Sequence, residues 1–269
     1  MNNKKMLLFP YTLWMIIFII IPIFIVLYYG LTNRDGNFTI SNIFAIFSPV
    51  NFKAFKISLN LAIVSTFFCL FLAYPLCMIL VSKNIKSNNF FIMLFILPMW
   101  MNFLLRTLAW QTILERNGVL NAILGFLSLP KVYIMNTKYA IILGMIYNFL
   151  PFMILPIYNS LVKIDKELIN ASKDLGANDV QTFFRIILPL TFPGVLSGII
   201  MVFVPALTTF AISDILGGGK IQLIGNIIDK EFTLASNWHV GSGLSIVLMI
   251  FVVFSMALIT KYEKEEEIK

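Results

Sequence analysis

Six long apolar runs dominate this chain and restrict what it can fold into. They cover residues 7–29, 57–81, 90–108, 139–161, 188–213 and 241–260. Each run approaches or exceeds the roughly 20 residues that a helix needs to cross a bilayer. Backbone polar groups must be bonded internally in lipid, and no alternating strand pattern indicates a barrel. The sequence therefore predicts an all-α integral membrane protein with six transmembrane helices.

Composition agrees with that class of protein. The 269 residues are 59% hydrophobic and 12% charged, whereas soluble domains are about 45–50% apolar and about 25% charged. The first run is too long for a signal peptide, and no small-residue cleavage site follows residues 28–30. We expect it to be a retained helix, with both termini in the cytoplasm. The net charge of +7 is then loop charge beside anionic membrane lipid and indicates no nucleic-acid partner.

A polar segment, residues 163–189, separates the fourth apolar run from the fifth. Apolar residues repeat at helical spacing in its first half, which predicts a short helix with one apolar stripe. The stripe consists of Ile164, Leu168, Ala171 and Leu175. Gly176 follows at the place where a helix end favours a left-handed residue. Asn178 or Asp179 is a suitable cap for a second helix.

The second helix of this segment is expected to turn Phe183, Phe184 and Ile187 inward and to stop at Pro189. The predicted result is a compact helical hairpin that projects from the membrane and offers its stripe to a groove on a partner. The alternative is an ordinary amphipathic loop that lies on the lipid headgroups.

The spacing of small residues favours the hairpin. Ala171 and Ser172 are followed by Gly176, and Ile186 and Leu188-Pro189 come after it. This pattern resembles the cytoplasmic coupling loop of ABC importer permeases, which reads Glu-Ala-Ala, three residues, Gly, nine residues, Ile-x-Leu-Pro. The resemblance implies a type I ABC importer permease fold and an ATPase that docks on the loop. ATP and magnesium would be bound by that partner ATPase, and no cofactor by this chain.

Two positions depart from the family pattern, and one of them is Ser172, which stands where the family has the second Ala. Asn170 stands where the family has Glu, and Glu167, one helical turn earlier, is expected to supply the carboxylate instead. The expected contacts with the ATPase are Glu167, Asn170, Ala171, Ser172, Gly176, Ile186, Leu188 and Pro189.

Other kinds of activity find little support in the sequence. The second, fourth and fifth runs contain no ionisable acid, base or histidine, whereas proton-coupled carriers keep such residues at mid-membrane. The glycines at 217–219 precede Lys220, but Ile221 stands where a phosphate-binding loop needs Ser or Thr. One histidine and two cysteines build no catalytic or metal centre. We therefore expect a transport subunit and no enzyme.

Further blocks of sequence narrow the resemblance. Residues 97–100, 105–110, 117–121, 147–161 and 213–218 resemble the permeases of spermidine/putrescine importers. That resemblance implies a heteromeric importer in the bacterial cytoplasmic membrane. Its other parts would be a second homologous permease, two ATP-binding cassette subunits and an external substrate-binding protein. The alternatives are an ABC permease for ferric iron, thiamine or an oxyanion, and a secondary carrier.

The same resemblance divides the chain into three parts. Residues 1–56 would form the first transmembrane helix with an external loop, and residues 57–260 the permease core with the coupling loop. Residues 261–269 would be a charged cytoplasmic tail.

A path for a polyamine calls for carboxylates and aromatic faces. The candidates are Asp214, Glu115, Trp100, Trp110 and Tyr147. Other roles are open for them: Asp214 as a cap of the glycine turn after it, and the tryptophans as interfacial anchors. Residues 205–214 are a candidate gate. Arg106 is expected to end the third run with its guanidinium reaching the headgroups.

Overall fold

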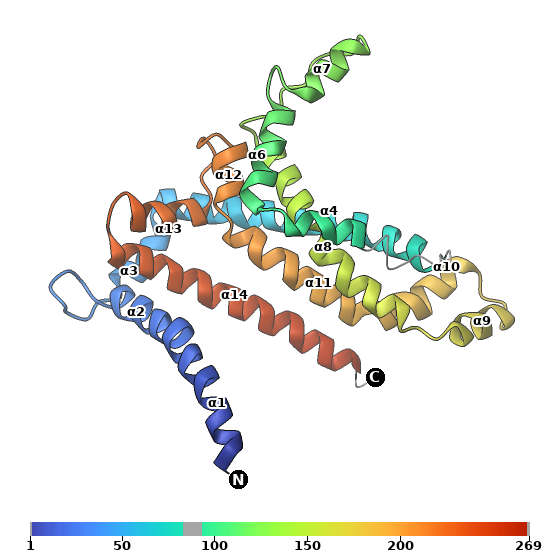
Figure 1. Cartoon of the computed structure of the whole chain (residues 1–269), viewed down its shortest axis with the longest axis horizontal. Coiled ribbons are helices and arrows are strands. Elements are labelled where there is room, and N and C mark those ends of the chain that lie inside the picture. The colour runs from blue at the N-terminus through green and yellow to red at the C-terminus, as the bar shows by residue number, and fades with distance from the viewer. Residues whose placement is uncertain (1, 83–92, 268–269) are drawn as a thin grey trace. The chain divides into compact units, whose positions relative to one another are not determined.

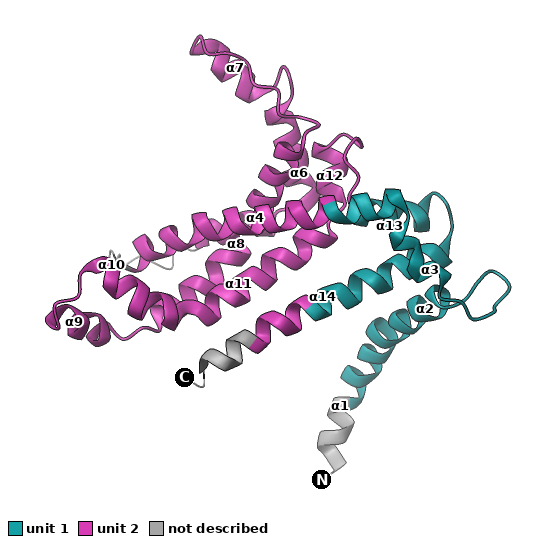
Figure 2. Ribbon diagram, turned by 180° about the vertical axis from the view of Figure 1, so that it is seen from behind, with its two compact units in different colours: residues 1–56, 224–254 teal, residues 57–223, 255–269 magenta. Residues whose placement is uncertain are grey.

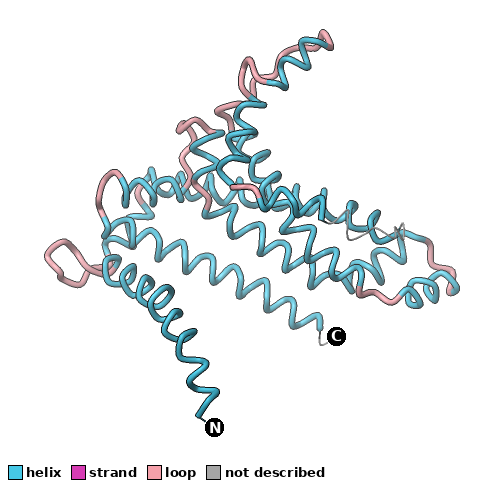
Figure 3. Tube along the Cα trace, viewed as in Figure 1, coloured by secondary structure: helices cyan, strands magenta, loops and turns pink. Residues whose placement is uncertain are grey.

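The computed structural model describes residues 2–82 and 93–267, and nearly all of that chain is helical or in connecting loops (Figure 3). Within those residues the β structure amounts to one isolated bridge between Thr32 and Phe38. The helices long and apolar enough to cross a membrane are Phe9–Gly30, Pro49–Val81, Lys138–Val162, Asp179–Thr208 and Trp238–Lys261. A bent helix pair brings the total to as many as six. The predicted all-α membrane architecture is confirmed.

The third span is broken rather than straight. Its two parts, Met93–Trp100 and Phe103–Phe126, meet at a bend of 99°. Asn102 has extended backbone at the bend, and its Oδ1 accepts hydrogen bonds from the backbone N–H groups of Leu104 and Leu105. This cap starts a new helix, α6 (Phe103–Leu114), in a new direction. The run predicted at residues 90–108 is therefore interrupted by a bend, and its first residues, 90–92, lie outside the described chain.

The fifth span also ends earlier than predicted. Helix α11 (Leu188–Thr208) closes with a hydrogen bond of 3.0 Å from the Thr209 N–H to the Pro205 carbonyl oxygen. Thr209 is extended, and α12 (Ala211–Leu216) begins after Phe210. Helix α12 buries Ile212 and Leu216 where it packs on α6 and α8 (Lys138–Val162). Tertiary packing therefore restarts the helix in another direction.

Contacts divide the chain into two compact units, which Figure 2 colours separately. Unit 1 is residues 1–56 with 224–254, and unit 2 is residues 57–223 with 255–269. Unit 1 contains α1 (Asn2–Met15), η1 (Ile16–Ile20), α2 (Ile21–Gly30), α3 (Ser41–Phe44), η2 (Ala45–Phe47), α13 (Ile224–Thr233) and the first part of α14 (Trp238–Glu267).

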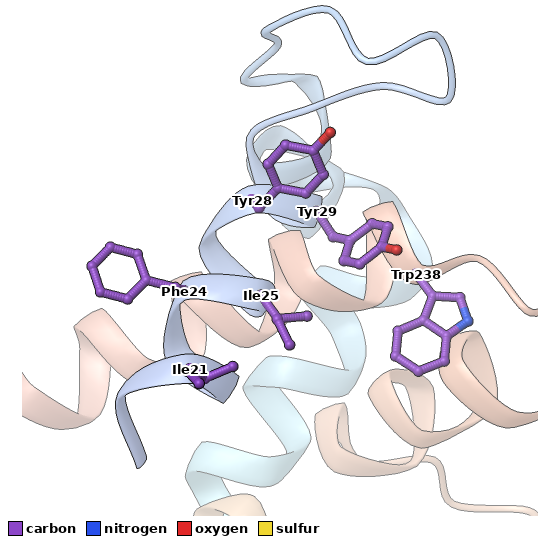
Figure 4. Close-up of a pocket in the computed structure, with 6 residues that line it drawn as sticks. All are labelled: Ile21, Phe24, Ile25, Tyr28, Tyr29 and Trp238. Carbon is purple, nitrogen blue, oxygen red and sulfur yellow. The ribbon is translucent and has the colours of Figure 1, made fainter. Parts of the chain in front are cut away.

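Unit 1 is held together at one end of its long helices. The buried amide of Asn42 donates to the carbonyl oxygens of Gly30 and Thr32, at 3.3 and 2.9 Å. Gly30 lies so close to Ser242 and Ile246 on α14 that a β-carbon there would clash. Along the rest of the first span the apolar side chains point outward, and 6% of its apolar window is buried. A groove of about 700 Å³ runs beside this contact, lined by Ile21, Phe24, Ile25, Tyr28, Tyr29 and Trp238 (Figure 4).

The core of unit 2 is formed by α8 and α11 together with residues 57–82 of α4 (Pro49–Ser82). Helix α4 contacts α8 where the Cys77 thiol donates to the Ile154 carbonyl oxygen at 3.5 Å. Helices α8 and α11 approach closely because Gly194 faces Ser160, and Gly198 faces Met153. The Tyr74 hydroxyl lies 2.7 Å from the Thr191 hydroxyl and joins α4 to α11.

Two functional regions of unit 2 connect to opposite ends of α8 (Figure 1). After Val162 the chain enters α9 (Lys166–Asp174) and α10 (Asp179–Thr182). Before Lys138 come α6 and α7 (Val119–Phe126). The loop before α8 is tied to the end of α12 by a hydrogen bond of 3.0 Å from the Asn136 N–H to the Leu216 carbonyl oxygen.

Candidate functional site

The polar segment at residues 163–189 forms the predicted helix–glycine–helix. Asp165 caps α9, accepting a hydrogen bond of 2.9 Å from the Glu167 N–H. Gly176 follows the helix with a φ of +84°, a conformation that glycine adopts without strain. Asn178 then caps α10 in a capping box with Gln181, in which each side chain accepts from the other residue's backbone N–H. Local sequence signals therefore specify both helices and the turn between them.

Two side-chain contacts fix α9 against α10. Ser172 is 6% exposed, and its hydroxyl lies 2.9 Å from the Thr182 hydroxyl and donates to the Ile169 carbonyl oxygen. Lys173 forms an ion pair of 2.9 Å with Asp179 across the turn. Sequence reasoning missed Thr182. The sequence signal for this contact was a hydroxyl residue at position 172 and another at position 182, which face each other once the turn forms.

The outer surface of this hairpin carries most of the predicted stripe. Leu168 is 49% exposed and Leu175 is 89% exposed, and Ala171 between them is also exposed. Glu167 and Asn170 are exposed on the same short helix. The hairpin therefore presents an apolar ridge with polar residues beside it. The caps and the contacts between α9 and α10 fix the shape of the turn that carries this ridge.

Two predictions about the second helix were wrong. Phe184 is 60% exposed instead of inward, whereas Phe183 packs edge-on against Tyr74 with ring centroids 5.5 Å apart. The helix does not stop at Pro189, which lies in the first turn of α11. A π-helical turn, η4 (Phe183–Ile187), precedes it. That wider turn changes the hydrogen-bond register just ahead of Pro189, which has no N–H to donate, and the helix continues through it.

The remaining hairpin positions lie along this continuous helix. Ile186 and Leu188 are half-buried, and Pro189 is exposed. Behind the hairpin, a cavity of about 630 Å³ separates it from the ends of α4 and α8. Its lining includes Met78, Val81, Tyr158, Ile164, Asn170 and Phe183.

The candidate path residues are brought together in part. Trp110 on α6 and Tyr147 on α8 form an edge-to-face pair with ring centroids 5.3 Å apart. Glu115 follows the last residue of α6 and is exposed, and Asp214 is exposed on α12. Trp100 is 75% exposed ahead of the bend. In the described ranges, no three His, Cys, Asp or Glu side chains converge as a metal site.

A polar layer at the crossing of α6 and α8 was not foreseen. Arg106, predicted to reach the headgroups, is 7% exposed, because α6 turns after the bend and carries its side chain into the protein. Thr107 and Asn148 are 0% and 1% exposed, and the Asn148 amide lies 3.4 Å from the Thr107 hydroxyl. The signal in the sequence was one asparagine within the otherwise apolar start of the fourth run.

Comparisons with known proteins agree with this architecture. Residues 2–262 match the family model described as binding-protein-dependent transport system inner membrane component. The chain is 40% identical over 253 residues to the spermidine/putrescine transport system permease protein PotB of Haemophilus influenzae, covering 90% of this chain and 88% of that protein.

Among solved structures, the fold matches a bacterial ABC transporter involved in the import of the acidic polysaccharide alginate. The TM-score is 0.80 at 18% identity, covering 96% of this chain and 95% of that chain. A second structure of a bacterial alginate ABC transporter, in complex with an alginate-bound periplasmic protein, gives a TM-score of 0.76 at 17% identity. That match covers 93% of this chain and 91% of that chain.

Proposed function

The chain belongs to the family of binding-protein-dependent transport system inner membrane components, and we propose that it is the permease of an ATP-driven importer for spermidine and putrescine. The observation that carries the substrate class is the 40% identity, over nine-tenths of the chain, to a permease named for those polyamines. The alginate transporters share the fold at 17–18% identity, so the fold alone leaves the substrate open.

Energy for this transport would come from a separate ATPase. ATP and magnesium would be bound in that partner chain, and this chain would act without a cofactor. The full importer would contain two ATPase subunits, a second homologous permease and an external substrate-binding protein. A periplasmic protein accompanies one of the structural relatives. The hairpin would face the cytoplasm, as would both termini, in a bacterial cytoplasmic membrane.

The hairpin has the properties that a mechanical coupling element needs. Its exposed ridge of Leu168, Ala171 and Leu175 would enter a groove on the ATPase, with Glu167 and Asn170 at the rim. The contact between Ser172 and Thr182 joins α9 to α10, and α10 continues through η4 into α11. A force on the ridge would therefore be passed to a membrane-spanning helix without an intervening flexible joint.

Aromatic and acidic groups near the other end of unit 2 suit a polycation. Cation–π contacts contribute about 0.5–2 kcal/mol each, and the paired rings of Trp110 and Tyr147 offer such faces. Asp214 and Glu115 are exposed carboxylates on α12 and next to the end of α6. We infer that these groups, with Trp100, contact the substrate as it passes.

The test is uptake of labelled spermidine by proteoliposomes that hold the assembled transporter, supplied with its binding protein and internal ATP. Glu167→Ala and Asn170→Ala should lower both uptake and binding-protein-stimulated ATP hydrolysis. Asp174→Ala, an exposed acid on the same helix outside the predicted contacts, is the matched control. Asp214→Asn should lower uptake, with Asp35→Asn in an exposed loop as its control.

Three results would overturn parts of this proposal. Uptake of ferric iron, thiamine or an oxyanion in place of spermidine would reassign the substrate. Wild-type coupling in both hairpin variants would remove Glu167 and Asn170 from the ATPase contact. Unchanged affinity and rate in Asp214→Asn would remove that carboxylate from the path.

A further inference from the structure

Three buried polar atoms at the crossing of α6 and α8 have no hydrogen-bond partner in the described chain. They are Nε and Nη1 of Arg106 and Oδ1 of Asn148. Arg106 is 7% exposed and Asn148 is 1% exposed. Unbonded polar groups inside a protein destabilise the conformation that contains them. Two of these atoms are N–H donors and the third is an acceptor, so each residue offers what the other lacks.

Asn148 contacts the residue that follows Arg106 in the sequence. Thr107, next to Arg106, has its hydroxyl 3.4 Å from Nδ2 of Asn148. That Nδ2 also donates to the Gly144 carbonyl oxygen at 2.9 Å, which directs Oδ1 to the other side of the amide. Two aromatic contacts flank the layer across the same pair of helices. They are Phe103 with Phe149, at 6.5 Å between ring centroids, and Trp110 with Tyr147, at 5.3 Å.

Both ends of α6 are breaks in the helical path. The helix begins after the 99° bend, at the Asn102 cap, and ends at Glu115, where the backbone becomes extended. Its other face is exposed at Leu104, Leu105 and Leu108, by 48%, 61% and 44%. Breaks at both ends absorb a change of direction while the helix keeps its internal bonds. Arg106 precedes Thr107, the residue that contacts Asn148, and lies about 100° from it around the helix. A turn of α6 that moves Arg106 toward the place of Thr107 would therefore carry its long side chain toward Asn148.

We propose that Arg106 and Asn148 are positioning residues that form a latch between α6 and α8. The latch is open in this structure and closes through a hydrogen bond from the guanidinium to Oδ1 of Asn148 when α6 moves during transport. The aromatic contacts favour the open arrangement and the new hydrogen bond favours the closed one, so a partner can shift the balance between them. The proposal rests on the transport function proposed above, since the two positions of α6 belong to a transport cycle.

The test begins by holding the latch closed. Asn148→Asp places a carboxylate where the amide oxygen was, and a charge-assisted bond to Arg106 is stronger than a neutral one. In the assembled transporter in proteoliposomes, we expect spermidine uptake to fall at least ~10-fold, which corresponds to a bias of about 1.4 kcal/mol toward the closed state. The amount of assembled complex should match that of the wild type.

The opposite change prevents closure. Asn148→Leu cannot accept a hydrogen bond and should also lower uptake. Adding Arg106→Met to it should lower uptake no further, because two residues that form one bond act as a unit. Thr112→Val on the exposed side of α6 is the matched control and should transport at the wild-type rate.

A second measurement separates a latch from a merely structural role. Leu108→Cys on the exposed face of α6 reports the position of the helix by its rate of maleimide labelling, with and without an ATP analogue. We expect the analogue to change the rate in the wild-type background and to have no effect with Asn148→Asp. Wild-type uptake in Asn148→Asp, or a response to the analogue as in the wild type, would overturn the latch. Failure of the wild-type complex to take up spermidine would instead count against the proposed substrate, and labelling would still test the latch.

Discussion

Polar side chains are hydrogen-bonded to near neighbours in the hairpin at residues 163–189, whereas several polar atoms of the described residues at the crossing of α6 and α8 stay unbonded. In the hairpin, the caps, the ion pair of Lys173 with Asp179 and the hydroxyl contact of Ser172 with Thr182 all join residues no more than 10 apart. At the crossing, the contact between Thr107 and Asn148 joins residues 41 apart, and three buried atoms stay unbonded. A region with satisfied local bonds has one stable shape, whereas a region with unsatisfied ones is suited to change its packing.

The largest effect on stability is expected at the crossing of α6 and α8, where a substitution should make the protein more stable. Arg106→Met removes a buried charge whose Nε and Nη1 lack partners, and each such group costs about 1–3 kcal/mol, more when charged. We expect the free energy of unfolding to rise by about 3 kcal/mol, measured by thermal unfolding of the purified chain in detergent. A loss of stability would mean that the guanidinium is bonded, and the contrast with the hairpin would disappear.

A loss of intermediate size is expected in the hairpin. Ser172→Ala leaves the buried Thr182 hydroxyl without its side-chain partner and should lower the free energy of unfolding by about 1–2 kcal/mol. The double change Ser172→Ala with Thr182→Val removes both groups and should cost less than the single change. Additive losses in the same unfolding measurement would show that the two hydroxyls do not depend on each other.

The smallest effect concerns the turn of the hairpin. Gly176 has a φ of +84° with no atom near its missing β-carbon, so Gly176→Ala introduces backbone strain of about 1 kcal/mol and no clash. Gly125 has the same free space but lies within α7 at an ordinary helical φ. Gly125→Ala should therefore stabilise the chain slightly. Equal effects of the two substitutions on the unfolding temperature would contradict a conformational role for Gly176.

Much of the candidate coupling hairpin could be predicted from the sequence because its signals are local. The apolar period, the glycine and the Asn178 cap all act within a few residues of the structure they specify. Where the prediction went wrong, a more distant contact decided the outcome. Phe183 packs against Tyr74 on α4, and Phe184 is left exposed. The helix continues through Pro189 after the π turn η4.

The candidate path residues were predictable as a set of residue types but not as a site. Trp110 and Tyr147 meet because α6 turns at Asn102 and crosses α8. Hydropathy showed one uninterrupted apolar run there, since a bend of 99° changes no side chain's polarity. The same bend carries Arg106 into the protein. Its position at the end of an apolar run had predicted a guanidinium at the membrane surface.

The sequence by itself determined that this chain is a helical membrane protein, where most of its spans lie and that a polar hairpin interrupts them. Those properties follow from the cost of burying backbone and side-chain polarity in lipid, which each residue carries independently of the fold. Only the tertiary structure decided how α6 crosses α8, which hydroxyl Ser172 contacts and that Arg106 is buried. Such contacts depend on the directions in which distant helices approach one another, and hydropathy along a chain contains no information about direction.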